Sequence, residues 1–216
     1  DPDHQQKVFN GPIGDEMFKL VIDKMEVTPL ATAYLGTRQV MLRDTKDIKT
    51  PADMKGIKLR MPASKEWLFL GEALGATPTP LAFGEVYLAL KTGTIDGQEN
   101  PLANIYTSSL QDVQTYLSLT GHMYDAAPLA VNTAWFETLP EEYQIILFEE
   151  ADHAREADLR ENDESKYLEL LKEAGMEINE VDKEAFQEAM SGIWEEFASQ
   201  YEDGQYWIDL ATSFNK

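Results

Sequence analysis

The side chains best suited to chemistry in this chain are arginines in one short basic segment of an acidic sequence. The 216 residues carry 18 Lys and Arg against 39 Asp and Glu, a formal net charge of −21. Residues 38–65 instead hold eight bases and only three acids. A planar guanidinium stays charged when buried and matches the geometry of a carboxylate, so this segment predicts a local anion site. Its lysines between 46 and 58 are expected to form a solvated loop.

Arg60 stands apart from those lysines because it lies in an alternating pattern. Ile57, Leu59 and Met61 fall on one face of a predicted strand, and Lys58 and Arg60 fall on the other. The pattern alone is compatible with Arg60 facing solvent or facing a ligand.

Other kinds of chemistry find little support in the residue types. The chain has no cysteine, and His4, His122 and His153 occur in unrelated contexts without a metal-binding or triad pattern. The run Gly11-Pro12-Ile13-Gly14 matches no phosphate-binding loop. We therefore expect no cofactor and no metal, and the negative charge makes nucleic acid or an anionic membrane surface a poor partner, so we expect no nucleic-acid binding.

The elements that must position the arginines alternate between helices and strands, which predicts an α/β fold. Apolar periodicity, caps and breakers predict helices over 13–25, 65–74 and 84–91. Extended segments are predicted over 27–34, 57–61, 76–81, 115–120 and 128–132.

A single long helix is predicted near the C-terminal half of the chain. A capping-box pattern begins at Thr138, and no Gly or Pro follows Pro140 until Gly175. The resulting helix of roughly 35 residues would measure about 50 Å. Its ends are apolar and residues 159–165 are nearly all polar, which favours a helix that bridges two lobes over a coiled coil. Two hinged lobes usually close on a small molecule.

Four motifs in order resemble one known family. They are Gly56–Pro62 (GIKLRMP), Gly75–Pro80 (GATPTP), Phe83–Gly93 (FGEVYLALKTG) and Ile95–Pro101 (IDGQENP). Together they resemble the solute-binding proteins of TRAP transporters, the DctP family, from about Phe9 through the C-terminal helices.

The resemblance implies a bacterial extracytoplasmic (periplasmic) protein that is not an enzyme. Members bind an organic acid between two α/β lobes and deliver it to a TRAP membrane permease. By this resemblance residues 1–35 and 126–160 are a remnant of the first lobe, and residues 36–125 form the second. Residues 161–216 would supply the second half of the bridging helix and C-terminal helices that pack on the second lobe.

The resemblance also implies a set of ligand-binding residues. Arg60 matches the arginine that binds the ligand carboxylate through two hydrogen bonds, and Arg38 matches a second arginine used on the same anion. Asn100 matches an amide that hydrogen-bonds the ligand, and Phe83 matches an aromatic ring that packs on its carbon skeleton. Trp67, on the helix after Arg60, is a candidate for stacking on a sugar ring.

Structural alternatives exist for several of these residues. Asn100 precedes Pro101 and fits a turn, while Phe83 and Trp67 fit a core. We expect Glu99 and its neighbour Gln98, like Glu85 and Tyr87, to be mainly scaffold, and His122 to join a hydrogen-bond network behind the cleft.

Departures from the family pattern limit the prediction. Members that bind sialic acid have Asn where this chain has Ala63, which argues against sialic acid and leaves uronates, other sugar acids, dicarboxylates and keto acids open. The family's first strand-helix-strand segment is missing, so we expect a partial chain. Uncovered sheet edges and apolar surface would then favour self-association.

Two other functional classes remain open. A carbohydrate-active enzyme would need two opposed carboxylates, with Glu85, Asp96 and Glu99 as candidates. An acidic interaction module would use residues 137–203, which carry 22 acids and five bases, to dock a basic partner. A binding protein differs from an enzyme in returning its ligand unchanged.

Overall fold

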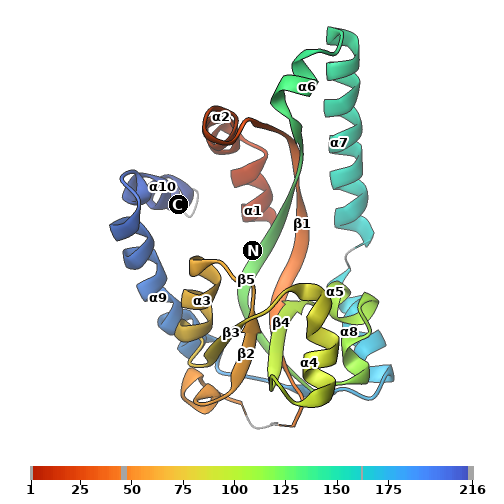
Figure 1. The fold of residues 1–216 in the computed structure, drawn as a ribbon, viewed down its shortest axis with the longest axis vertical. Helices are drawn as coiled ribbons and strands as arrows, with labels where there is room; N and C mark the ends of the chain where they lie inside the picture. Colours follow the sequence, from red (N-terminus) through yellow and green to blue (C-terminus); the bar gives the residue numbers. More distant parts are fainter. Residues whose placement is uncertain (1, 45–47, 162, 214–216) are drawn as a thin grey trace. The chain divides into compact units, whose positions relative to one another are not determined.

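The chain folds into two compact α/β units. The computed structural model describes residues 2–44, 48–161 and 163–213. One unit comprises residues 1–36, 124–163 and 206–216, and the other comprises residues 37–123 and 164–205. Two long strands, β1 (Val27–Leu42) and β5 (Tyr116–Asn132), contribute to both units (Figure 1). Lys46 of the basic segment and Asn162 of the predicted long helix lie outside the described residues.

A six-stranded mixed sheet forms the centre of the second unit. The strand order is β3-β2-β4-β1-β5-β6. Strand β2 is parallel to β3 and β4, β1 is antiparallel to β4, and β5 is parallel to β6. The four short strands are β2 (Lys58–Met61), β3 (Thr77–Pro80), β4 (Gly97–Pro101) and β6 (Glu177–Asn179).

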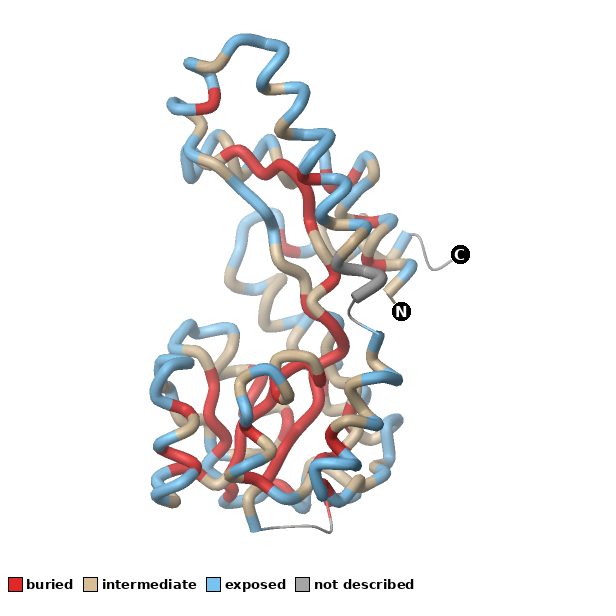
Figure 2. The backbone as a smooth tube through the Cα atoms, turned by 90° about the vertical axis from the view of Figure 1, so that its right-hand side faces the viewer, coloured by how far each residue is buried: buried red, intermediate tan, exposed pale blue. Residues whose placement is uncertain are grey.

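Helices cover both faces of this sheet because side chains alternate along each strand. Val40 and Leu42 point into a core shared with α3 (Lys65–Ala73) and α9 (Lys183–Gln200). Met41 points the other way, into a core that contains residues of three further helices. These helices are α4 (Val86–Thr92), α5 (Leu102–Thr107) and α8 (Glu164–Glu173). The two cores bury the central strands of this unit (Figure 2).

The first unit is mainly helical and has a smaller core. Leu30, Ala31, Phe136 and Ala151 form that core. The unit contains the outer halves of β1 and β5 and most of α10 (Gly204–Thr212). Its other helices are α1 (Pro2–Phe9), α2 (Pro12–Met25), α6 (Thr133–Glu137) and α7 (Glu141–Glu161). Short 3-10 turns in the second unit are η1 (Pro51–Met54), η2 (Phe83–Glu85) and η3 (Leu110–Asp112).

Several local predictions are confirmed, and some element limits differ. Helix α3 begins after Ser64, whose hydroxyl accepts a hydrogen bond from the backbone N–H of Trp67 at 3.5 Å. The strand expected to end near Gly36 continues to Leu42, because Gly36 accommodates a φ of 123° inside the strand. The two strands predicted over 115–120 and 128–132 are one strand, β5.

The prediction of one uninterrupted helix from 138 to 175 is wrong. Helix α7 ends at Glu161 and α8 begins at Glu164, and Asp163 between them is not helical. Asp and Asn side chains compete with the backbone for hydrogen bonds, so a polar stretch with no apolar face favours a break. Helix α7 belongs to the first unit and α8 to the second. Residues 206–213 belong to the first unit. In the described part of the chain, no helix is both long enough and apolar enough to cross a bilayer.

Gly121 in β5 provides a test of backbone strain. Its φ is 55°, and a Cβ added there would meet only Thr37 Cγ2, at 3.8 Å. We expect Gly121→Ala to lower the free energy of unfolding by about 1–2 kcal/mol, because a side chain disfavours the left-handed backbone rather than clashing. Gly84→Ala is the matched control, since its φ is not positive and nothing lies within 4 Å of the added Cβ. Urea denaturation measures both, and equal losses would contradict the prediction.

Candidate ligand-binding site

Arg60 is buried on β2, the central strand of the three parallel strands β3, β2 and β4. It lies on β2, opposite Thr79 of β3 and Gln98 of β4. Only 5% of the residue is exposed. Its Nε donates a hydrogen bond to the carbonyl oxygen of Leu81 at 2.9 Å, and its guanidinium carbon lies 5.7 Å from the ring centroid of Phe83. Within the described residues no carboxylate forms an ion pair with it.

The electrostatic surroundings disfavour this isolated charge. Burial lowers the pKa of Arg60, the negative charge of Glu99 works in the opposite direction, and the positive charge of Arg38 lowers the pKa further. A guanidinium remains protonated at neutral pH despite such shifts. The folded chain therefore holds a buried cation that an incoming anion would stabilise.

Arg38 is equally buried but already has a counter-ion. Its Nε and Nη2 donate to the two carboxylate oxygens of Glu99 at 2.5 and 2.8 Å, and Nη2 also donates to the Glu99 backbone oxygen at 2.8 Å. The ring of Trp67 lies 4.6 Å from the Arg38 guanidinium carbon, in cation–π geometry. This bidentate pair compensates the charge of Arg38, which distinguishes it from Arg60.

Glu99 also connects Arg38 to His122. The His122 Nε2 atom lies 3.2 Å from Glu99 Oε2, and its Nδ1 atom lies 2.8 Å from the hydroxyl of Thr120. Burial acts to raise the pKa of Glu99, but the hydrogen bonds from His122 and Arg38 outweigh it and hold that pKa below its usual value. The predicted participation of His122 in a hydrogen-bond network is confirmed.

Asn100 extends the network along β4. Its Oδ1 accepts a hydrogen bond from Arg38 Nη2 at 3.2 Å, and its Nδ2 donates to Gln98 Oε1 at 2.5 Å. Gln98 Nε2 donates to Gln114 Oε1 at 3.2 Å. Asn100 is buried within a strand, so the alternative that it only forms a turn is wrong.

The structure brings the five predicted ligand-binding residues together as two groups in the second unit. Arg38 contacts both Asn100 and Trp67. Arg60 lies next to Phe83, which is 45% exposed and therefore not a core residue. Trp67 is half-buried and packs both on Arg38 and against the core beneath α3.

Sequence reasoning underestimated Glu99. Its buried contacts with Arg38 agree with the predicted scaffold role, and its charge also acts on Arg60, which the prediction did not include. The available signal was chemical, because a buried arginine needs a buried acid and Glu99 directly precedes Asn100 in its motif.

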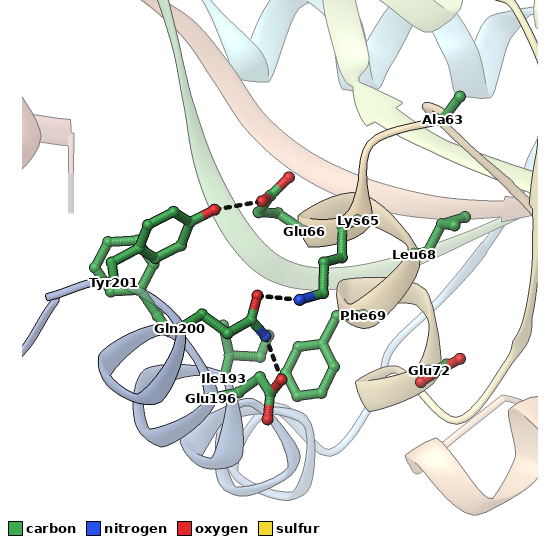
Figure 3. A pocket seen from close by; sticks show the side chains of 11 residues that line it. Ala63, Lys65, Glu66, Leu68, Phe69, Glu72, Ile193, Glu196, Gln200 and Tyr201 are labelled. Atoms are coloured by element: carbon green, nitrogen blue, oxygen red, sulfur yellow. Dashed lines mark hydrogen bonds between the residues drawn. The ribbon is translucent and has the colours of Figure 1, made fainter. Parts of the chain in front are cut away.

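A separate groove lies between α3 and α9 in the same unit. Its volume is about 500 Å³, and Leu68, Phe69 and Ile193 provide apolar side chains along it (Figure 3). Lys65 and Tyr201 reach across it through hydrogen bonds to Gln200 and Glu66, at 2.5 and 2.7 Å. None of the predicted ligand-binding residues lines the groove. In the described part of the chain, no cluster of His, Asp and Glu side chains has the arrangement needed to hold a metal ion.

Comparison with known proteins defines the class of this chain. It belongs to the DctP family, family 7 of the bacterial extracellular solute-binding proteins, whose family model matches residues 1–200. This is a family of binding proteins rather than of enzymes.

Individual relatives agree with that assignment. The chain is 35% identical over 193 residues to the 2,3-diketo-L-gulonate-binding periplasmic protein YiaO of Escherichia coli, and this match covers 88% of the chain. A TRAP periplasmic solute-binding protein from Roseobacter denitrificans, solved with bound 3-deoxy-D-manno-oct-2-ulosonic acid, is 37% identical with a TM-score of 0.91, covering 98% of this chain and 71% of that one. A third, from Chromohalobacter salexigens with bound D-glucuronate, is 30% identical with a TM-score of 0.92 over 98% of this chain and 71% of that one. The chain spans 58% of the length of YiaO.

Removing the Glu99 charge should destabilise the fold in a pH-dependent way. Glu99→Gln removes the charge of the carboxylate that pairs with the buried Arg38, so we expect the free energy of unfolding at pH 7 to fall by about 3 kcal/mol. The folded pKa of Glu99 is depressed, so its stabilising contribution is present above the unfolded pKa of about 4.3 and is lost as pH falls through the lower folded value. The difference between the two proteins should therefore narrow on strong acidification.

Chemical denaturation across pH measures this difference. Glu66→Gln is the control, because that carboxylate also has a depressed pKa but is exposed, bonded to Tyr201. It should leave stability nearly unchanged. A loss for Glu66→Gln as large as that for Glu99→Gln would show that the buried pair has no special role.

Proposed function

We propose that this chain is the ligand-binding part of a periplasmic solute-binding protein of a TRAP transporter. In this proposal it binds an organic acid through an arginine–carboxylate pair and passes it to a membrane permease. The acid is held by Arg60, with Arg38, Asn100, Phe83 and Trp67 completing the site. In this proposal the two compact units correspond to the two lobes of the family.

The main support for the proposal is that Arg60 is buried and pairs with no carboxylate among the described residues. A buried cation without a carboxylate partner is energetically unfavourable, and such groups are retained mainly where function needs them. Its planar donors suit bidentate binding of a carboxylate. Phe83 beside it offers an exposed aromatic surface that suits the C–H face of a ligand skeleton.

The relatives support an acid as the ligand. The three relatives described above bind 2,3-diketo-L-gulonate, 3-deoxy-D-manno-oct-2-ulosonic acid and D-glucuronate, respectively. All three compounds are sugar acids. Because this chain spans only part of those relatives, its ligand and its permease partner belong to the proposal. The self-association expected for a partial chain likewise stays a prediction.

The three candidate carboxylates of the competing enzyme hypothesis do not form an opposed pair of free acids. Glu99 is committed to Arg38, and Asp96 accepts a hydrogen bond from the backbone N–H of Lys58 at 2.9 Å. Glu85 is exposed at the start of α4. No observation favours the acidic interaction module over a solvated helical surface.

Replacing Arg60 should remove ligand binding without damaging the fold. A thermal-shift screen with sugar acids, dicarboxylates and keto acids first identifies acids that raise the unfolding midpoint of the wild-type chain. We expect Arg60→Met to abolish the shift, and Arg60→Lys to lose most of it because an ammonium lacks the planar fork. Without ligand, Arg60→Met should be about 1 kcal/mol more stable, since it removes an uncompensated buried charge.

Lys58→Met is the matched control, because Lys58 is an exposed cation two residues earlier on the same strand. It should keep the full ligand-induced shift. If Arg60→Met binds the acid as well as the wild type does, or if both variants lose binding equally, Arg60 does not have the proposed role.

A further inference from the structure

The groove between α3 and α9 in the second unit has no role in the proposed acid site. Its volume of about 500 Å³ lies within the range of about 300–1,000 Å³ that is typical of binding pockets. Four half-buried side chains provide most of its apolar surface: Leu68, Phe69, Ile193 and Phe197. Contiguous apolar surface that remains open to solvent on a folded protein commonly indicates an interaction site.

Carboxylates line this groove together with the apolar side chains. Glu66 and Glu72 belong to its α3 side, and Glu196 belongs to its α9 side (Figure 3). Among the described residues that line the groove, Lys65 is the one cation. Within the described part of the chain, none of the three carboxylates forms an ion pair with a lysine or arginine. An apolar groove with such edges is complementary to an apolar group flanked by cations.

Two hydrogen bonds cross the groove at one end and fix its shape. Lys65 Nζ donates to Gln200 Oε1 at 2.5 Å, and the hydroxyl of Tyr201 donates to Glu66 Oε1 at 2.7 Å. These bonds join the first turn of α3 to the end of α9. A groove that is already formed binds a partner without the entropic cost of ordering it.

We propose that this groove is a docking site for a cationic amphipathic segment of another protein. The segment places apolar side chains against Phe69 and Phe197 and its lysines or arginines beside the glutamates, as an amphipathic helix does in a hydrophobic groove. The groove shares no residue with the proposed acid site, so docking and acid binding can be tested independently.

The spacing of the carboxylates favours a peptide segment over other occupants. Glu66 and Glu72 are six residues apart on α3, which corresponds to about 9 Å along a helix. A peptide with two basic residues spans that distance, whereas a small ligand with one amino group reaches only one of the two carboxylates. A second copy of this chain is disfavoured, because its net charge of −21 is repelled by an acidic groove.

Binding of designed peptides tests the docking site. The probe is a helical peptide of about 14 residues that carries leucines on one face and lysines on either side of them. Its counterpart has glutamate in place of every lysine. Fluorescence anisotropy of the labelled peptides with the full chain is measured at about 0.15 M salt, which screens distant surface charges. We expect the cationic peptide to bind at least tenfold more tightly than the anionic one.

Groove variants with matched controls locate the bound peptide. Glu196→Lys should weaken binding of the cationic peptide at least tenfold. Glu195→Lys makes the same charge change at the neighbouring exposed residue of α9, outside the groove, and should weaken it less than threefold. Phe69→Ala should weaken it at least tenfold, whereas Leu88→Ala, at a leucine on α4 that is 63% exposed, should leave it unchanged. The unfolding midpoint of each variant is checked first, and Glu72→Lys, at an exposed carboxylate, replaces a groove variant that does not fold.

Three results would overturn the proposal. The first is an equal loss for Glu195→Lys and Glu196→Lys, which would show that the peptide follows the general acidity of the surface. The second is absence of binding, or binding that Phe69→Ala does not weaken. The third comes from sedimentation velocity of the chain alone, in which a dimer that Phe69→Ala dissociates would assign the groove to a second copy.

Discussion

A buried charge needs a counter-charge, and this constraint governs the second unit of the structure. That unit buries two guanidinium groups but, in its described residues, one carboxylate. Glu99 pairs with Arg38, and hydrogen bonds from His122 and Arg38 lower the pKa of Glu99 against the effect of burial. Arg60 keeps a backbone carbonyl and an aromatic neighbour instead. This imbalance is the reason for proposing Arg60 as the group that binds an external anion. The lysines of the basic segment that the structure describes are all exposed and lack this property.

The register of the short strands determines which partner each buried polar side chain reaches. Strand β4 lies between β2 and β1, so Gln98 lies opposite Arg60 while Glu99 lies opposite Val40. Because alternate residues of a strand share a face, Asn100 can bond Gln98 while Glu99 bonds His122, and Arg38 donates to both Glu99 and Asn100. Three consecutive polar residues on one buried strand can therefore all be satisfied. The helices on either side supply apolar cores that keep water from these groups.

The sequence predicted the parts of this arrangement that depend on local pattern. Alternation over 57–61 predicted β2, and the cap at Ser64 predicted α3. The resemblance predicted five ligand-binding residues, which remain a prediction, and all five lie in the second unit. Strand β4 was not predicted, because its residues are polar and are buried only through tertiary hydrogen bonds. The break before Glu164 was missed because absence of Gly and Pro permits a helix without enforcing one. The pairing of Arg38 with Glu99, 61 residues apart, depends on the register of β1 and β4, which no local pattern encodes.

The two arginines illustrate how a binding protein can separate rigidity from affinity. Arg38 is fixed by an ion pair, an amide and an indole ring, so it shapes the site without adding net charge. Arg60 retains its charge in a buried position, which makes the ligand-free fold less stable than it would be with an apolar residue. A carboxylate that binds there replaces hydration the guanidinium has already lost, so less of the interaction energy is consumed by desolvating the protein. In the proposed function, the unfavourable burial of the Arg60 charge is therefore the physical source of affinity for an anion.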